Sequence, residues 1–258
     1  MRIARIAHPQ GMSFARLEGD GPGATAAEID GHPFAGVKLT GQRWALDDVR
    51  LLAPVIPSKI VCIGRNYAEH AEEQGAEVPS EPLLFLKPST AVVGPGDPVT
   101  VPTVADDIEH EAEMAVVIGL PGARKVSREA ARQAILGYTC ANDVTARDLQ
   151  KRDGQWTRAK GFDSFCPLGP WVETDLDTHD AEIRCEVNEE VRQLDSTKSM
   201  VFDPASIVAY ISQVMTLLPG DVVLTGTPAG IGPMNAGDKV SISVAGIGTL
   251  TNQVVASE

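Results

Sequence analysis

The apolar residues of this chain follow the helical period in two segments. In residues 204–218 they recur every three or four positions, the spacing of one face of an α-helix. Asp203 stands before this segment as an N-cap, Pro204 fits the first helical position, and Pro219 with Gly220 ends it. A second helix is expected over residues 128–138, after the N-cap Ser127, with its stop at Gly137. The apolar positions are Ile207, Val208, Ile211, Val214, Met215 and Leu218 in the first helix and Ala130, Ala131, Ala134 and Ile135 in the second.

Most of the remaining chain shows the pattern of short strands and turns. MRIARI (residues 1–6) and SFARLE (residues 13–18) alternate apolar and polar positions, which is typical of half-buried strands. Further strands are expected within residues 59–64, 91–102, 181–188, 221–226 and 239–255. The 18 prolines and 24 glycines divide these runs. The pattern predicts a β-rich α+β fold, because strands and helices do not alternate regularly.

The segment LLAPVIPSK (residues 51–59) marks a domain boundary. Its two prolines, Pro54 and Pro57, cannot continue a helix or a central strand. With 258 residues, 43% of them hydrophobic, the chain is long enough for one large and one small core. We expect a small N-terminal α+β domain over residues 1–54 and a main, catalytic domain over residues 55–258.

Composition and charge exclude several classes of protein. The net charge of −13 and the pI of about 4.8 argue against a nucleic-acid partner, which needs a basic surface. No run of 18 apolar residues is present, and the N-terminus has no signal-peptide pattern, so we expect no membrane contact. The four scattered cysteines suit buried thiols in a reducing cytoplasm, and the five histidines have no zinc spacing. The expected location is therefore cytoplasmic.

An acidic series opens an otherwise apolar strand in DDIEHEAEMAVVIG, residues 106–119. Glu109, Glu111 and Glu113 are two residues apart, so they share one face of a strand at a spacing of roughly 6.6 Å. Like charges on one face repel each other, and a hard divalent cation such as Mg²⁺ would offset this repulsion. A solvated strand end is the simpler reading, and the acids alone do not decide between the two.

A further acid, Asp143, follows the segment 128–138 in TCANDVTARDLQ. If the segment that follows it is helical, Arg147 and Gln150 share a face with it. Asp143 at the end of a strand would complete a set of three carboxylates with Glu111 and Glu113. The alternative is that Asp143 caps a helix.

Three other segments carry candidate chemistry. Lys160 precedes the apolar run FCPLGPW, so it is either a buried ammonium that stabilises negative charge or a surface lysine. His70 and Glu73 are three residues apart, the spacing of a carboxylate-oriented general base or of an ordinary helix surface pair. Arg65 could pair with a substrate carboxylate. The glycine-rich LTGTPAGIGP is not a nucleotide loop, because no helix follows it, and Thr227 within it suits a carboxylate-binding loop.

Taken together and in this order, these motifs closely resemble the fumarylacetoacetate hydrolase family. The segments that carry the resemblance are GRNYAEHAEE, FLKPSTAVVGPGD, HEAEMAVVIG, NDVTARDLQ, GQWTRAKGFDSFCPLGPW and LTGTPAGIGPMNAGD. They are similar to the short bacterial branch of acylpyruvate hydrolases, oxaloacetate decarboxylases and dienedioate isomerases. The resemblance covers about residue 55 to the C-terminus, and residues 1–50 look like the variable N-terminal domain. It implies a mixed β-sandwich or β-roll catalytic domain.

The resemblance also implies roles for individual residues. The divalent metal, Mg²⁺ or Mn²⁺, would be held by Glu111, Glu113 and Asp143, with Glu109 outside the motif. His70 and Glu73 would form the catalytic pair on a mobile lid, and Lys160 would lie beside the metal. The substrate contacts would be Tyr67, Arg147, Gln150 and Thr227.

The implied reaction proceeds through a metal-stabilised enolate of a small 2-oxo acid. His70 would activate a water molecule that attacks the C4 carbonyl, so C–C bond hydrolysis is the activity we expect first. Isomerisation of a 2-hydroxy-dienedioate and decarboxylation of oxaloacetate pass through the same enolate and remain alternatives. A metal-dependent dicarboxylate binder without turnover is the alternative of another class. The family also implies a homodimer.

Overall fold

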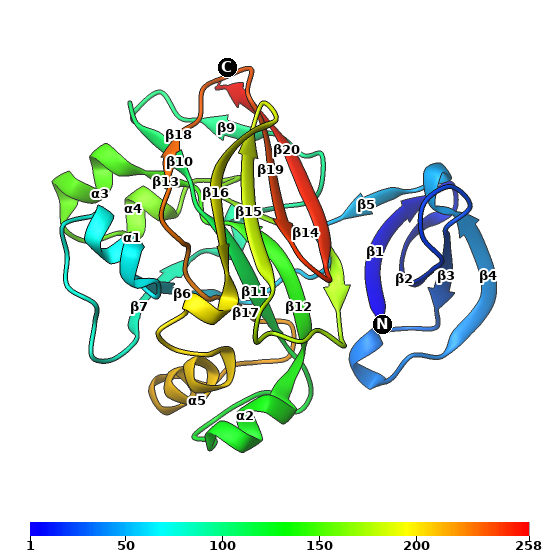
Figure 1. Cartoon of the computed structure of the whole chain (residues 1–258). Coiled ribbons are helices and arrows are strands. Elements are labelled where there is room, and N and C mark those ends of the chain that lie inside the picture. Colours follow the sequence, from blue (N-terminus) through cyan, green and yellow to red (C-terminus); the bar gives the residue numbers. More distant parts are fainter. Residues whose placement is uncertain (258) are drawn as a thin grey trace.

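The computed structural model describes residues 1–257 and is built mainly of strands (Figure 1). The largest sheet has twelve strands, and ten of them lie in the order β4-β3-β2-β1-β14-β12-β11-β17-β6-β7. The other two strands, β5 and β8, pair with β1 and β14 at its side. The bounds of these strands are β1 Arg2–His8, β2 Gly11–Glu18, β3 Thr25–Ile29, β4 Leu39–Ala45, β5 Arg50–Leu52, β6 Ile60–Gly64, β7 Leu83–Lys87, β8 Val92–Val93, β11 Ala112–Ile118, β12 Ile135–Asn142, β14 Cys166–Glu173 and β17 Val222–Leu224.

Two smaller sheets complete the strand structure. The five-stranded sheet has the order β16-β15-β19-β20-β9, and the three-stranded sheet has the order β13-β10-β18. Their bounds are β9 Val99–Val101, β10 Ile108–His110, β13 Thr145–Ala146, β15 Glu182–Val187, β16 Glu190–Ser196, β18 Gly232–Pro233, β19 Lys239–Val244 and β20 Gly248–Ala256. One buried cluster includes Met114 and Cys140 from the large sheet and Ile183 and Ile242 from the five-stranded sheet, so the two sheets share a core. This arrangement confirms the predicted β-rich α+β class.

The helices are short and lie at the periphery of the sheets (Figure 1). They are α1 Ala68–Glu73, α2 Arg128–Ala134, α3 Arg147–Asp153, α4 Thr157–Lys160 and α5 Pro204–Val214, with 3-10 turns at Pro33–Ala35, Leu46–Asp48, Ser89–Ala91 and Thr197–Ser199. Helices α2 and α5 cover a second core cluster on one side of the large sheet. No helix within residues 1–257 is long and apolar enough to cross a membrane.

The predicted cap of α5 is confirmed. The Asp203 carboxylate accepts hydrogen bonds from the N–H groups of Ala205 and Ser206, both at 3.1 Å, and Pro204 occupies the first turn. The helix ends at Val214, earlier than the expected Leu218, because Leu217 pairs with Ala123 in an isolated β-bridge.

The start of the helix expected over residues 128–138 is confirmed, but its predicted end is wrong. Ser127 caps it as predicted, but α2 ends at Ala134, and Ile135 begins the central strand β12. In β12, Gly137 lies so close to β14 that a Cβ atom there would be 2.4 Å from the carbonyl oxygen of Glu173. Pairing with β11 and β14 therefore overrides the local helical pattern, and Gly137 permits close strand contact instead of stopping a helix.

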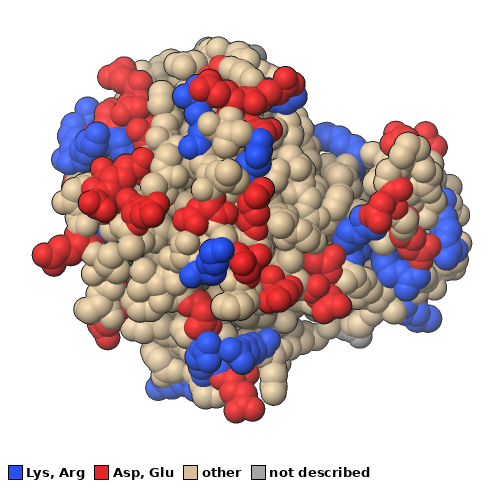
Figure 2. Space-filling view, in the orientation of Figure 1, with Lys and Arg blue, Asp and Glu red and all other residues tan. Residues whose placement is uncertain are grey.

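Residues 1–54 form strands β1 to β5 and two of the 3-10 turns. They extend the large sheet, because β1 pairs antiparallel with both β14 and β5. In Figure 1 this blue segment projects to one side of the body that contains the other helices and sheets. We keep the division at residue 54 as a proposal. Figure 2 shows acidic and basic side chains interspersed over the visible face of both parts.

The cap of α5 gives a prediction about stability. Asp203→Ala should lower the free energy of unfolding by about 1–2 kcal/mol, because two partly buried helix N–H groups lose their acceptor. Urea unfolding monitored by circular dichroism measures this change. Asp203→Ser, which keeps an acceptor at the N-cap, serves as the control and should lose less than half as much. Equal losses in both variants would contradict the capping role.

Candidate metal centre and active site

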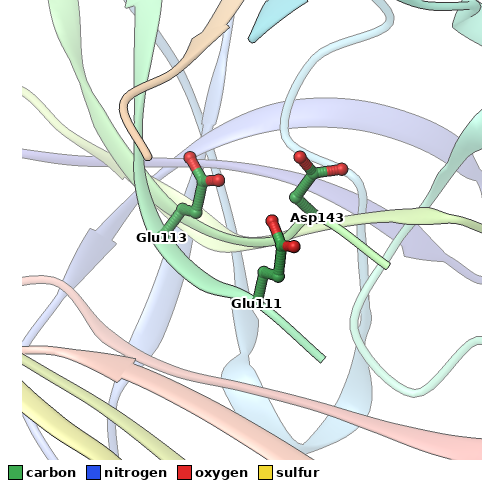
Figure 3. Close-up of side chains that lie close together, drawn as sticks. All are labelled: Glu111, Glu113 and Asp143. Atoms are coloured by element: carbon green, nitrogen blue, oxygen red, sulfur yellow. The ribbon is translucent and has the colours of Figure 1, made fainter. Parts of the chain in front are cut away.

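Three acidic side chains converge where β11 and β12 run side by side. Glu113 lies on β11, Glu111 directly precedes that strand, and Asp143 directly follows β12. The pairing of Ala112 with Asn142 and a 2.9 Å hydrogen bond from the Asp143 N–H to the Glu111 carbonyl fix this register. One carboxylate oxygen from each acid lies within 4.8 Å of the other two, and the side chains point toward one another (Figure 3).

Burial of the acids decides between the readings that the sequence left open. Glu111, Glu113 and Asp143 are 5%, 1% and 0% exposed, so they are not a solvated strand end. Asp143 does not cap a helix either, because α3 begins after Ala146. The strand that was expected to carry the acids is interrupted at Glu111, between β10 and β11. Glu109 lies on β10 and belongs to the surroundings of the cluster, where it accepts a 2.6 Å hydrogen bond from Arg147.

Three buried cations surround the carboxylates. The Lys160 ammonium donates to Glu111 at 2.9 Å and to Asp143 at 2.8 Å. Lys87, at the end of β7, donates to Asp143 at 2.5 Å, and Arg147 donates to Glu111 at 2.6 Å. Lys160 is 2% exposed, which excludes the reading of a surface lysine. Glu111 and Asp143 therefore each have two cationic partners in the interior, where an unpaired charge would be costly.

Glu113 differs from the other two acids, because no side-chain cation within residues 1–257 forms an ion pair with it. Its carboxylate accepts a 2.6 Å hydrogen bond from the backbone N–H of Gly226. Burial raises the pKa of Glu113 well above its ordinary value, and the nearby Asp143 and Glu111 carboxylates raise it further. Burial also acts to raise the pKa of Glu111, but Lys160 and Arg147 outweigh it and hold that pKa below its ordinary value. Among the acids of the cluster, Glu113 therefore has the greatest need of a further positive charge.

The donor set fits a hard divalent cation. Three carboxylates supply only oxygen ligands, which Mg²⁺ and Mn²⁺ prefer, and no cysteine or histidine belongs to the group. A cation held by Glu111, Glu113 and Asp143 would stabilise the ionised form of Glu113.

His70 and Glu73 lie on α1 and form a hydrogen-bonded pair. His70 Nδ1 is 3.1 Å from one Glu73 oxygen, and the Gly230 N–H donates to the other oxygen at 3.0 Å. The His70 side chain is buried, so the pair is not an ordinary surface pair of a helix. Asn66 anchors the start of this segment, because its side chain bonds the backbone of Phe202 and of Thr225.

A narrow cavity joins the histidine to the carboxylate cluster. His70, Glu111, Lys160 and Thr227 all line it. It leaves only about 10 Å³ in which the centre of a water molecule fits, which is room for about one water. A substrate with several carbon atoms can therefore enter only if part of the lining moves, and α1 contributes His70 to that lining.

A wider cavity of about 580 Å³ adjoins the narrow one. Arg65, Gln74, Gln150 and Trp156 line both cavities, so the wide one forms the approach to the narrow one. Gly64 permits this arrangement, because a Cβ atom there would lie 2.9 Å from the Trp156 ring.

The expected substrate contacts occupy different positions. Arg65, Gln150 and Thr227 line the narrow cavity, as a contact with a ligand requires. Arg147 lines the wider one, and its guanidinium already bonds Glu109, Glu111 and Gln150. Tyr67 is 1% exposed and lines neither cavity, and its hydroxyl has no hydrogen-bond partner within residues 1–257. Burial and the nearby Glu113 raise the Tyr67 pKa, so the phenol stays neutral.

Sequence reasoning missed Lys87, which lies as deep as the acids. Its side chain is 0% exposed, and it bonds both Asp143 and the carbonyl oxygen of Val144. The available signal was a lysine at the end of the apolar run LLFL, directly before Pro88. A position next to an apolar run was also the reason for which Lys160 was considered a candidate for a buried ammonium. Trp156 was also missed. It lines the narrow cavity, the wider cavity and a third cavity beside β7.

Known protein families and individual known proteins match this chain. The family model "Fumarylacetoacetate (FAA) hydrolase C-terminal" matches residues 59–255, and the model "Rv2993c-like, N-terminal" matches residues 1–54. Protein Rv2993c of Mycobacterium tuberculosis is 52% identical over 99% of this chain and 98% of its own length. A human mitochondrial oxaloacetate tautomerase is 42% identical over 81% of this chain and 70% of its own length.

Two solved structures are also similar to this chain. The crystal structure of 5-carboxymethyl-2-hydroxymuconate delta-isomerase from Mycobacterium smegmatis has a TM-score of 0.94 and 53% identity and covers 100% of both chains. Fumarylpyruvate hydrolase from Pseudomonas aeruginosa, crystallised with Mn²⁺ and pyruvate, has a TM-score of 0.74 and 33% identity and covers 81% of this chain and 92% of its own.

The raised pKa of Glu113 yields a prediction. Above pH 4.5, the ordinary glutamate pKa, the metal-free protein should lose stability as the pH rises, because the folded state retains a proton that the unfolded state releases. Glu113→Gln should remove this dependence and raise Tm at pH 8 by about 2–4 °C. It should also weaken Mg²⁺ binding in calorimetry. The exposed Glu182→Gln is the control, and undiminished Mg²⁺ affinity in Glu113→Gln would contradict the ligand assignment.

The narrow cavity yields a prediction about α1. This helix has six residues, is polar, and is too short to be stable by itself, so without ligand it should open often. Hydrogen exchange should show protection of residues 68–78 gained on adding oxalate with Mg²⁺. Residues 204–214 of α5 are the internal control and should not change. Equal protection of residues 68–78 in both states would argue against a lid.

Proposed function

This chain belongs to the fumarylacetoacetate hydrolase family, and we propose that it is a Mg²⁺- or Mn²⁺-dependent enzyme acting on small 2-oxo acids. The observation that carries the proposal is the narrow cavity that His70, Lys160 and Glu111 of the carboxylate cluster line together. A base, a fixed positive charge and a set of metal ligands are thereby brought to the same reacting atoms.

Glu111, Glu113 and Asp143 would hold the metal, which would supply a Lewis acid for the 2-oxo group of the substrate. The protein side chains supply the remaining steps. Glu73 accepts the Nδ1 proton of His70, which leaves a lone pair on Nε2, and the Gln74 amide lies 3.2 Å from this atom. When a ligand displaces that amide, Nε2 takes a proton from the water that attacks the C4 carbonyl. The C3–C4 bond then breaks, its electron pair passes to C3 and the 2-oxo group as the enolate, and His70 returns the proton to C3.

Lys160 holds the negative charge that develops on the substrate. Burial lowers the pKa of its ammonium, but Asp143 and Glu111 outweigh that effect and raise the pKa, so the group stays charged at neutral pH. The same contacts fix the ammonium before the substrate arrives, and a fixed charge needs no reorganisation during the reaction. Arg65, Gln150 and Thr227 orient the substrate from the walls of the cavity.

C–C bond hydrolysis is the activity we propose first, and isomerisation is an equally supported alternative. The similar proteins carry the names of an isomerase, a hydrolase and an oxaloacetate tautomerase, and all three reactions pass through an enolate of a 2-oxo acid. Decarboxylation of oxaloacetate uses the same enolate. The intact His70–Glu73 pair favours an enzyme over a dicarboxylate binder without turnover. A homodimer in the cytoplasm remains part of the proposal.

One panel of substrates decides among these activities. The purified protein is assayed with Mg²⁺ and with Mn²⁺ on acetylpyruvate, fumarylpyruvate, oxaloacetate and a 2-hydroxymuconate-type dienoate. Turnover of an acylpyruvate supports the hydrolase, and turnover of the dienoate alone supports the isomerase. If no substrate reacts while oxalate binds in a metal-dependent way, the binder is the correct reading.

The separate positions of His70 and Lys160 predict different losses. His70→Ala should reduce acylpyruvate hydrolysis by about 10²–10⁴-fold, the usual contribution of a positioned base, and should reduce oxaloacetate decarboxylation less. Lys160→Met should reduce both, because the charge it removes faces the common enolate. The rates are measured at one Mg²⁺ concentration, and each variant is checked for cooperative unfolding.

Glu72→Ala, which replaces an exposed acid on the same helix, is the matched control and should keep both activities. Equal loss of both activities in His70→Ala would mean that the base acts in a shared step. That result would contradict the division of labour proposed for α1 and the carboxylate cluster.

A further inference from the structure

We propose that Gln193 is a positioning residue that turns the Thr227 hydroxyl into a hydrogen-bond donor aimed at the bound ligand. The inference rests on the proposed function, because it concerns the same cavity. Gln193 lies on β16, an edge strand of the five-stranded sheet, where its neighbours Arg192 and Leu194 are exposed. Its own side chain is turned inward, and the residue is 1% exposed.

The backbone fixes the orientation of the Gln193 amide at both ends. The Ala112 N–H donates to Gln193 Oε1 at 2.9 Å, and Gln193 Nε2 donates to the Pro228 carbonyl at 2.8 Å. A backbone N–H can only donate, and a carbonyl can only accept. Exchanging the oxygen and nitrogen of the amide would therefore break both contacts, so its orientation is determined by the hydrogen bonds.

This orientation determines the role of Thr227. Gln193 Nε2 also lies 2.7 Å from Thr227 Oγ1, and because Nε2 only donates, the threonine oxygen must accept. The single hydroxyl proton then points elsewhere, and no other side-chain hydrogen bond of Thr227 occurs within residues 1–257. Thr227 lines the narrow cavity beside Glu111 and Lys160, so the proton is available to a ligand in that cavity.

The chemical consequence is a preference for ionised carboxylates at this position. A carboxylate offers only lone pairs, which match a hydroxyl that can only donate inward. A ligand amide N–H at the same place can only donate, and it would meet a threonine oxygen with one lone pair already occupied by Gln193. Hydrogen bonds to a charged acceptor are the stronger kind, so the orientation contributes to ligand affinity.

Gln193 also joins the loop that carries Thr227 and Pro228 to strand β11, on which Glu113 lies. Ala112, whose N–H it accepts, lies between Glu111 and Glu113. The loop packs closely on β16, since a Cβ atom at Gly230 would lie 2.3 Å from the Arg192 carbonyl oxygen. A purely bracing role for Gln193 would therefore affect metal binding and stability, whereas orientation of the hydroxyl affects ligand binding.

A double-mutant cycle separates these two roles. Oxalate is the probe, because it is a dicarboxylate that can chelate the metal, and its affinity is measured by calorimetry at saturating Mg²⁺. Thr227→Val should weaken oxalate binding about tenfold, the size of one hydrogen bond to a charged group, with an unchanged Mg²⁺ affinity. Gln193→Met should weaken it about fivefold or more. In the Thr227→Val background, Gln193→Met should have no further effect, because the hydroxyl is already gone.

Controls keep every outcome informative. Thr227→Ser retains the hydroxyl and should bind oxalate within about twofold of the wild type. Val191→Met, at an exposed position of the same strand, should not change the affinity. Additive losses in the double variant, or wild-type oxalate affinity in Gln193→Met, would overturn the proposal. Wild-type affinity in Thr227→Val would overturn it as well, and that test does not depend on a Gln193 variant folding.

The proposed function fails in a different way. If the wild-type protein shows no Mg²⁺-dependent oxalate binding, the metal site itself is wrong. If the wild type binds oxalate and only the Gln193 and Thr227 results disagree with expectation, the metal site stands and the positioning role is lost.

Discussion

The structure around the active site depends on the repulsion among three buried carboxylates. Glu111, Glu113 and Asp143 bring carboxylate oxygens within 4.8 Å of one another, and all three residues are buried. Lys87, Lys160 and Arg147 pair with Glu111 and Asp143, and these cations come from β7, α4 and α3. The remaining acid, Glu113, accepts a hydrogen bond only from the backbone N–H of Gly226 within residues 1–257. Its raised pKa keeps a proton on it in the metal-free protein, and a bound cation would take the place of that proton.

The fold supplies this arrangement through the register of two central strands. β11 is buried on both faces and pairs with β12 on one edge and β17 on the other, so Glu113 cannot move into solvent. The same pairing brings Asp143 next to Glu111. The loop after β17 then contributes Gly226 and Thr227, and α1 carries His70 to the same cavity. The central strands and their ends thus hold the three carboxylates, and a short helix and a loop hold His70 and Thr227.

Local signals in the sequence predicted the local features, and long-range contacts limited the rest. The cap at Asp203 and the facing of His70 and Glu73 depend on neighbours within three residues, and both were predictable. The end of α2 was not, because Ile135 joins a strand that pairs with distant parts of the chain. The period of two placed Glu111 and Glu113 together and left Asp143 as either the third carboxylate or a helix cap, and the resemblance favoured the third carboxylate.

The buried partners of the acids were the hardest to predict. Lys87 is 56 residues from Asp143 and Gln193 is 81 residues from Ala112, and neither partner is indicated by spacing. Arg147 was expected to contact the substrate, whereas its guanidinium supports Glu109 and Glu111. A single sequence shows that a polar residue lies in an apolar run, but the identity of its partner depends on how the sheets stack.

The two oxygens of Glu73 have a consequence for how substrates are selected. One oxygen orients the imidazole of His70, and the other is held by the Gly230 N–H on the loop that also carries Thr227. The Gly230 contact therefore fixes the carboxylate that orients the imidazole when α1 rests on that loop. Under the proposed function, a molecule of the wrong length would bind at the carboxylate cluster, keep α1 away from the loop and leave His70 misaligned, so it would turn over slowly. Discrimination would then appear as a difference in kcat among ligands of similar affinity, which is selection by induced fit.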